Sequence, residues 1–445
     1  MQLILRGSIP GMLARLAVPN ILAVATMTVV TFADVYFVGH LGTTALASLA
    51  VVFPFQTLLG MTSNGAIGGG VASSIARALG ADRFADAESA AWHSLLVAGL
   101  MSAIYVVLLG MLARPVLSML GVPENVLDGA VEYSRVLFLG APIVWFAFMM
   151  SATLRGIGEM AIAGNTIVVA GVVHIFLSGA LTLGWGPFPK IGLIGPAITY
   201  LTTHGFIAAY LLSKFWGADS KFRLRPHRFS WKPVREILSV GGPGLVNSSG
   251  LVLTVIVVTG FVSRFGEEAL AGYGLGSRLE LTLVPLAFGV GAALVTAVGA
   301  NFGAGQFSRA RRIAWAGAGF TFAVTTLAGL LVAIFPELWL DRFTSDPAVS
   351  TIGAKYLQIA APAYGIFAAG QTLYFASQGT GRMVLPVIAT YSRLLVVVMV
   401  GLLALSLDSD HTILFIGVAV GLAVMGLAQM LNVFASPTWN RDIDV

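Results

Sequence analysis

The chain contains no cysteine, and only 10% of its 445 residues are Asp, Glu, Lys or Arg. The absence of cysteine excludes disulfides, thiol chemistry and Cys-ligated metal sites. Soluble domains contain roughly 25% charged residues, so this composition leaves no soluble domain of useful size. The chain has neither a Walker motif nor an HExxH motif, and no lysine follows the glycine-rich run at 65–70. These absences argue against an enzyme and against a nucleic-acid-binding protein.

Apolar residues make up 57% of the chain, and its mean hydropathy is +0.89. They form continuous runs of about 20 residues, the length at which a helix crosses a ~30 Å hydrocarbon core. The runs lack the polar–apolar alternation of membrane β-strands. The sequence therefore predicts an all-α polytopic membrane protein with twelve transmembrane helices at 14–38, 46–76, 90–113, 130–154, 161–184, 193–214, 238–263, 270–301, 313–335, 352–377, 384–407 and 412–435.

Lys and Arg residues are distributed unevenly between the two sides that these spans define. Seventeen lie on the side of both termini, six lie on the other side, and Arg278 and Arg393 fall inside spans. Cytoplasmic loops carry an excess of Lys and Arg. We therefore expect a multi-pass protein of the cell (inner) membrane with both termini in the cytoplasm.

The longest polar stretch is the basic segment 214–235, at the midpoint of the chain. Its Lys and Arg residues alternate with Phe and Trp, a composition that suits contact with nucleic acid or with anionic lipid. Juxtamembrane basic clusters commonly set topology and lie on the inner leaflet, and we interpret the segment in this way. It also predicts a connector between a six-helix lobe at 1–220 and a second at 221–445.

The two halves of the sequence are related by an internal repeat. Shifts of 223 or 224 residues align Pro19 with Pro243, Gly42 with Gly266, 45–47 with 269–271, 80–84 with 303–307, Tyr133 with Tyr356, and 155–160 with 378–383. Six spans per half preserve topology, so we expect pseudo-symmetric, parallel lobes. Transporters built from such repeats move their lobes to expose a substrate site to each side in turn.

Asp34 is the only formally charged residue between Leu16 and Val38, inside the first predicted span. On a helix it shares a face with Thr31 and Met27. Burial disfavours the charged form of a carboxyl, so a buried Asp34 would bind a proton or pair with a cation, which is the simplest basis for antiport. A second interpretation stays open, an interfacial aspartate about one helical turn from the membrane boundary.

Taken in order, these motifs resemble the multidrug and toxic compound extrusion (MATE) family. The resemblance rests on LAxP…D…VGxLGxxALA at 16–47, GADRF at 80–84, RGxG at 155–158 and a weaker second copy, and it covers essentially the whole chain. The segment 271–280, followed by Pro285, is most similar to the DinF subfamily. The resemblance implies an exporter of two six-helix lobes that exchanges protons or sodium ions for cationic or amphipathic drugs.

The resemblance also implies roles for residues on the first and fifth helices. The family's functional aspartate corresponds to Asp34, and bending of its helix on protonation makes Pro19 a candidate hinge. Sodium-coupled relatives carry Asn-x-x-x-Asp on the fifth helix, where His174 and Ser178 stand in this chain. This departure removes a carboxylate and adds an imidazole, which favours H⁺ over Na⁺. A lone histidine on an apolar helix is equally compatible with a hydrogen-bonded core residue.

Charged and polar residues inside other spans are further candidates. Arg278 and Glu280 are two residues apart and face nearly opposite sides of a helix. These two and Arg393 are each compatible with a cavity-lining role or a structural ion pair. Polar residues that line a cavity, or that bond neighbouring helices instead, are expected among Tyr36, Gln56, Asn64, Asn165, Thr199, Thr202, Asn247, Ser277, Gln371, Tyr374 and Tyr391.

The function expected from these observations is secondary active export of cationic or amphipathic small molecules by alternating access. An ion gradient would drive it without a cofactor or metal, and the chain would act as a monomer in the lipid bilayer. Two alternatives remain, a Na⁺-coupled MATE exporter and a flippase for lipid-linked precursors. A flippase needs a cationic cavity for pyrophosphate, and only Arg278 and Arg393 are available inside spans.

Overall fold

The computed structural model describes residues 1–216, 222–407 and 410–439, without the side chains of 216, 281–282 and 284–285. Lys221 and Arg441, which entered the count of basic residues, lie outside the described residues. So do the Pro285 side chain and residues 217–221 of the predicted connector.

The described part of the chain is all-helical, which confirms the predicted fold class. Its elements are α1 (Gln2–Arg6), α2 (Ile9–Gly39), α3 (Thr43–Gly60), the π-helix η1 (Met61–Ile67), α4 (Gly68–Gly80), α5 (Phe84–Tyr105), the π-helix η2 (Val106–Met111), α6 (Ala113–Ser118), α7 (Glu124–Leu139), α8 (Ala141–Ile157), α9 (Met160–Leu183), η3 (Gly192–Ile194), α10 (Gly195–Trp216), α11 (Trp231–Val262), η4 (Ser263–Phe265), α12 (Glu267–Gly303), α13 (Phe307–Ile334), α14 (Glu337–Leu340), α15 (Pro347–Ala360), η5 (Ala361–Ala363), α16 (Tyr364–Thr380), α17 (Val384–Ser406) and α18 (His411–Ala435).

Each of the twelve predicted spans lies on one helix or on consecutive helices. Within the described residues, nine helices are long and apolar enough to cross a membrane, and α7 with α8, bent by 47°, makes a tenth. The other two predicted spans lie on α10, which carries Thr203 and His204, and on α15–η5–α16. Since α16 is buried along its length, it does not need a lipid-facing apolar surface.

The chain folds into two compact units, Val18–Gly241 (the N-terminal unit) and Met1–Ala17 with Gly242–Val445 (the C-terminal unit). This division differs from the predicted lobes 1–220 and 221–445 because α2 and α11 continue across the boundaries. The first residues pack in the C-terminal unit, where Asn301 Nδ2 donates to the Ile4 carbonyl at 3.2 Å. The start of α11 packs in the N-terminal unit, where Ser74 Oγ donates to Glu236 Oε2 at 3.3 Å.

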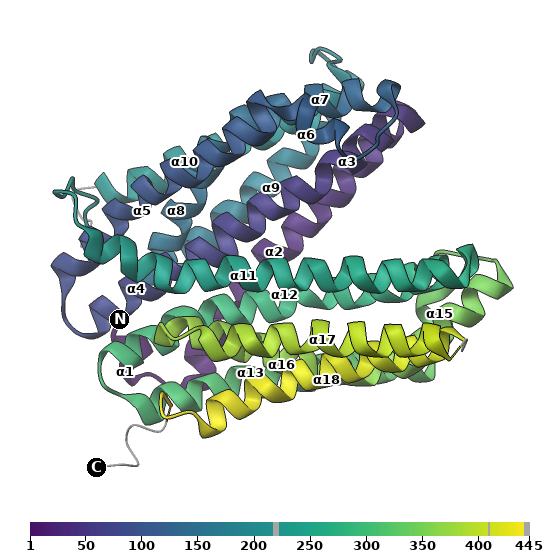
Figure 1. Ribbon diagram of the computed structural model, residues 1–445. Coiled ribbons are helices and arrows are strands. Elements are labelled where there is room, and N and C mark those ends of the chain that lie inside the picture. The colour runs from purple at the N-terminus through teal and green to yellow at the C-terminus, as the bar shows by residue number, and fades with distance from the viewer. Residues whose placement is uncertain (217–221, 408–409, 440–445) are drawn as a thin grey trace. The chain divides into compact units, whose positions relative to one another are not determined.

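Equivalent helices form the centre of each unit. In the N-terminal unit α8 packs against α4, α5 and α10, and in the C-terminal unit α16 packs against α12, α13 and α18 (Figure 1). Gly156 of α8 lies against the Ala72 carbonyl, and Gly379 of α16 lies against the Val295 carbonyl. A side chain at either glycine would collide with backbone, so both contacts depend on glycine.

The repeat is visible in backbone angles as well as in sequence. Gly42 and Gly266 precede α3 and α12 with φ of +113° and +102°, and Gly158 and Gly381 end α8 and α16 with φ of +92° and +79°. Residues with a side chain rarely adopt these backbone angles, which explains why glycine occurs at the same places in both halves.

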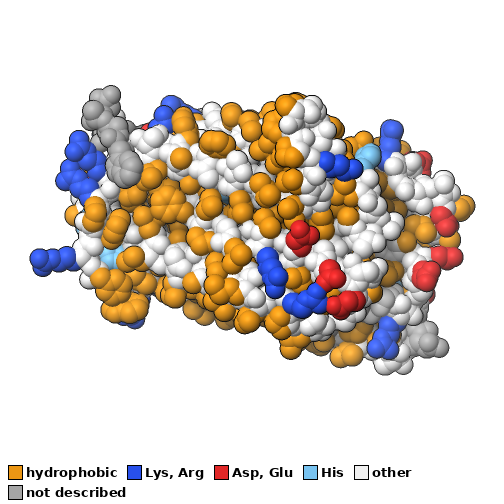
Figure 2. Space-filling view, turned by 90° about the horizontal axis from the view of Figure 1, so that it is seen from above, with side chains coloured by type: hydrophobic (Ala, Val, Ile, Leu, Met, Phe, Trp, Pro, Cys, Tyr) orange, Lys and Arg blue, Asp and Glu red, His pale blue; other side chains and the backbone are white. Residues whose placement is uncertain are grey.

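Much of the surface is apolar. Hydrophobic side chains are spread across the whole face in Figure 2, whereas charged side chains form a few separate groups. Phe32, Phe176 and Leu327 are each about two-thirds exposed or more. Such a surface suits the hydrocarbon core of a bilayer and would aggregate in water.

Candidate functional site

Asp34 lies in α2 of the N-terminal unit, with 7% of its surface exposed. Ser178 Oγ, from α9, donates to Asp34 Oδ1 at 2.6 Å. His174 Nε2, one turn earlier on α9, lies 3.1 Å from both carboxylate oxygens. The structure thus brings together the three residues that the resemblance placed on the first and fifth helices.

The second ring nitrogen of His174 has a hydroxyl partner on α10. His174 Nδ1 lies 3.4 Å from Thr203 Oγ1, and the Thr203 hydroxyl donates to the Thr199 carbonyl at 2.8 Å. With that proton directed at the backbone, Thr203 Oγ1 can accept from Nδ1–H. In the Nδ1–H tautomer, Nε2 is an acceptor that faces the Asp34 carboxyl, and the contact is a hydrogen bond when one proton lies between the two groups.

A small pocket adjoins the cluster within the N-terminal unit. Met27 and Val30 of α2, Ala170, Gly171 and His174 of α9, and Tyr200, Thr203, His204 and Ile207 of α10 line it. Sequence analysis missed Tyr200, Thr203 and His204. Of these three residues, only His204 could have been recognised in the sequence, because it is a titratable residue in an apolar helix. In the structure, His204 Nδ1 donates to the Tyr200 carbonyl at 2.8 Å.

Pro19, the candidate hinge, lies within the unbroken helix α2. A Cβ added at Gly164 of α9 would lie 2.6 Å from the Pro19 carbonyl oxygen. The backbone of α9 therefore lies close to α2 at Pro19, where proline removes a backbone donor.

The other predicted residues of the N-terminal unit form hydrogen bonds with residues other than Asp34, or have exposed side chains. Thr31 Oγ1 donates to the Met27 carbonyl, the Tyr133 hydroxyl donates to Gln56 Oε1, and the Asn64 carbonyl accepts from Arg155. Exposed side chains are those of Tyr36, Asn165 and Thr202. These contacts involve none of the cluster's polar atoms.

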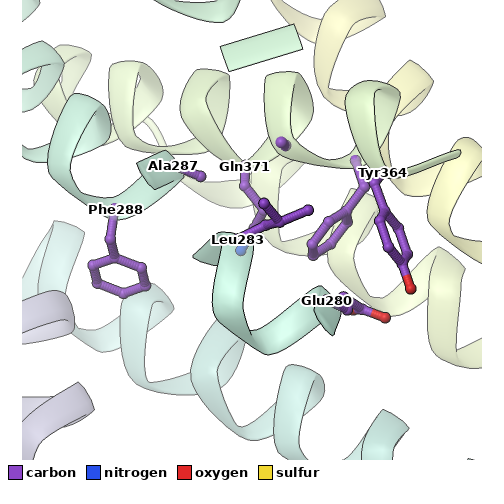
Figure 3. A pocket seen from close by; sticks show the side chains of 8 residues that line it. Glu280, Leu283, Ala287, Phe288, Tyr364 and Gln371 are labelled. Atoms are coloured by element: carbon purple, nitrogen blue, oxygen red, sulfur yellow. The ribbon is translucent and has the colours of Figure 1, made fainter. Parts of the chain in front are cut away.

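In the C-terminal unit, two of the three predicted charges, Glu280 and Arg393, form a largely buried pair. Arg393 Nη2 of α17 donates to Glu280 Oε1 of α12 at 3.0 Å, and its guanidinium lies 5.0 Å from the centre of the Phe367 ring. Glu280 borders a pocket with Leu283, Ala287, Phe288, Tyr364, Phe367, Ala368 and Gln371. Figure 3 shows Glu280 and Tyr364 at one end of this pocket and Phe288 at the other. Arg278 is exposed.

The repeat-related positions in the C-terminal unit carry no equivalent of the Asp34 cluster. Val258 and Val397, the counterparts of Asp34 and His174, are buried in a hydrophobic core. Gly401 replaces Ser178 and lies against the Phe261 ring. The acid, imidazole and hydroxyl therefore occur together in one half of the repeat.

Known proteins resemble this chain over most of its length. It is 25% identical over 370 residues to a FAD transporter of Shewanella oneidensis, covering 81% of this chain and 80% of that protein. It is 26% identical over 384 residues to the probable multidrug resistance protein YoeA of Bacillus subtilis, covering 83% and 81%. A crystal structure of "MATE in the bent conformation" superposes with a TM-score of 0.90 at 20% identity, covering 99% of this chain and 98% of that chain.

The family model MatE matches residues 19–178 and 243–403, so it matches once in each half of the repeat. Its two matches begin at Pro19 and Pro243, the prolines that the internal repeat aligns. The chain therefore belongs to the MatE family of membrane transporters.

Proposed function

We propose that this protein is a secondary active exporter that moves small cationic or amphipathic molecules in exchange for protons. The Asp34–His174–Ser178 cluster carries this proposal. A buried carboxylate that faces an imidazole at 3.1 Å can take up and release a proton with small movements of the side chains.

Charge makes the proton and a cationic cargo compete for the site. With one proton between the two groups, the Asp34–His174 pair is neutral overall. Without it, His174 can turn its remaining N–H toward Asp34, and the pair keeps one negative charge, which is costly in a membrane interior. A cation in the adjoining pocket would relieve that cost, and proton uptake would remove the attraction and release the cation.

The pocket favours a cargo with an apolar or aromatic body. Met27 offers a flexible, polarisable surface, and Tyr200 adds an aromatic ring to the lining. YoeA is named a probable multidrug resistance protein, which agrees with such a cargo. The relative named FAD transporter suggests an anionic alternative, but the carboxylate beside this pocket would repel a pyrophosphate.

Two other ion and cargo assignments fit the residues less well. Sodium prefers several oxygen ligands, and an imidazole faces Asp34 where a second carboxylate would be needed. A flippase for lipid-linked precursors needs cations for its pyrophosphate, but Arg393 is neutralised by Glu280.

We propose that the protein works as a monomer in the inner membrane, with both termini cytoplasmic, by alternating access.

The test is transport by full-length protein in proteoliposomes under imposed gradients. Asp34→Asn should abolish efflux of a fluorescent cationic dye driven by a pH gradient, whereas Asp341→Asn, at an exposed aspartate, should transport like wild type. Retained pH-driven efflux by Asp34→Asn would overturn the proposal. Efflux that follows a sodium gradient at constant pH would overturn the proton assignment, and efflux of FAD in place of the dye would overturn the cargo.

A further inference from the structure

The described part of the predicted connector follows a defined course along α5. We call residues 222–235 the basic strap. The Arg223 backbone N–H donates to Glu88 Oε1 at 3.3 Å, and the Ser230 backbone N–H donates to His93 Nε2 at 2.9 Å. His93 Nδ1 in turn lies 2.7 Å from the Ser89 carbonyl. These contacts attach the basic strap to α5 near both of its ends.

The attachment gives the basic strap an inner and an outer face. Residues 223–230 form no regular helix or strand, and side chains of an extended chain alternate between faces. Phe222 and Leu224 are buried, whereas Arg223 and Arg225 are exposed. The apolar side chains thus anchor the segment, and basic side chains point outward.

The outer face carries more positive charge than the protein neutralises. Five residues between 222 and 235 are Lys or Arg, and none is Asp or Glu. Lys232 Nζ lies 3.4 Å from Asp86 Oδ2. Arg225, Arg228 and Arg235 are exposed and have no ion pair within the described residues.

Two exposed aromatic rings lie beside these arginines. Phe229 is 59% exposed and Trp231 is 71% exposed, and their ring centres are 5.2 Å apart. Trp231 is also the first residue of the candidate span Trp231–Phe265. Tryptophan concentrates at the boundary between hydrocarbon and headgroups, so this position suits a ring inserted among lipids.

We propose that the basic strap is a binding surface for anionic phospholipid headgroups, with Arg225, Arg228 and Arg235 contacting phosphate and Phe229 and Trp231 inserting between lipids. Guanidinium groups bind phosphate through paired hydrogen bonds. The strap lies on the side that the distribution of Lys and Arg predicts to be cytoplasmic, where the leaflet is negatively charged. Bound lipid would hold this segment of the N-terminal unit at the membrane surface, independently of the chemistry at Asp34.

The test measures lipid binding by the full-length protein in phosphatidylcholine nanodiscs, titrated with short-chain phosphatidylglycerol. The triple variant Arg225→Gln/Arg228→Gln/Arg235→Gln should bind phosphatidylglycerol at least about tenfold more weakly. A control triple, Lys190→Gln/Arg264→Gln/Arg342→Gln, removes the same charge from exposed positions predicted to be on the other side. It should bind within about twofold of wild type.

Two further measurements keep the proposal testable if the triple variant misfolds. Phosphatidylglycerol binding by wild type should weaken with rising salt, and Trp231→Ala should weaken it severalfold. Equal losses in the two triple variants would overturn the proposal, as would binding insensitive to salt. Tight binding of a short RNA that displaces phosphatidylglycerol would assign the surface to nucleic acid instead.

Discussion

The chemistry available to Asp34 depends on two side chains of one neighbouring helix, α9. Asp34 has one hydroxyl donor, Ser178, and one titratable partner, His174, and all three are buried. Hydrogen bonds to a charged group contribute about 1.5–3 kcal/mol each. Ser178 therefore holds the carboxyl in position, and His174 offers a second place for the proton that we propose to be exchanged.

His174→Gln should separate the imidazole's contribution from that of the carboxyl. Glutamine retains an N–H donor for Asp34 but cannot bind a proton, so the exchanged proton would reside on the carboxyl alone. We expect the pH profile of efflux, measured as initial rates across a pH series, to differ from that of wild type. His40→Gln, at an exposed histidine, is the control, and an unchanged profile would contradict a proton shared with His174.

The contact between α2 and α9 depends on glycines of α9. Cβ atoms added at Gly164 and Gly171 would lie 2.6 Å from the Pro19 carbonyl and 2.4 Å from Thr26 Cγ2. Gly171 follows Gly164 by seven residues, His174 follows Gly171 by three, and Ser178 follows His174 by four. These spacings place all four residues on the same helix face. Small residues let membrane helices approach closely, and here the approach brings α9 side chains within hydrogen-bonding distance of Asp34.

Gly164→Ala should force the two helices apart at Pro19. The added methyl group would meet backbone, which cannot rotate away as a side chain can. We expect a loss of about 1–3 kcal/mol of stability and slower efflux, measured by thermal unfolding in detergent and by transport. Gly99→Ala places a methyl group on α5 with no atom within 4 Å. It should be neutral or stabilising, and equal effects of the two substitutions would rule out this packing role.

The start of α18 provides a pH-dependent test at the level of one helix. Asp410 caps this helix, and hydrogen bonds from the Thr412 hydroxyl and backbone, followed by the Lys355 ammonium, lower its pKa from 3.8 to about 2. A lowered pKa in the folded state gives stability that is present above pH 4 and is lost as the pH falls through about 2.

Asp410→Ala should therefore cost about 0.5–1 kcal/mol near neutral pH, with little added by the exposed pair with Lys355. The difference from wild type should stay constant above pH 4 and shrink between pH 4 and pH 2. Thermal unfolding midpoints in detergent across this range measure it, with Asp341→Ala as a control at another exposed aspartate. A difference that grows on acidification would contradict the capping assignment.

At the scale of the whole molecule, one duplicated scaffold carries two different buried charge arrangements. Composition predicts the helices because each must satisfy its backbone within a membrane, and the aligned glycines Gly42 and Gly266 mark the repeat in the sequence. Asp34 stands out as the lone charge of its span. Contacts between helices, such as Thr203 with His174 and Arg393 with Glu280, cannot be recognised in the same way. They depend on how α10 packs against α9 and how α17 packs against α12, and the sequence of one helix does not determine this. Thr203 was missed for this reason, and the Glu280–Arg393 pair appeared only as two separate candidates.

The two arrangements should respond differently when their charges are removed. Arg393→Met leaves Glu280 buried without its partner, which typically costs about 3–5 kcal/mol, whereas replacing both members of a buried pair often costs little. We therefore expect Glu280→Gln/Arg393→Met to unfold at a higher temperature than Arg393→Met alone. Because Val258 and Val397 stand at the positions of the residues that we propose to bind the proton, the double variant should still export a cationic dye when a pH gradient is imposed. A folded double variant without proton-driven efflux would show that coupling also requires the C-terminal unit.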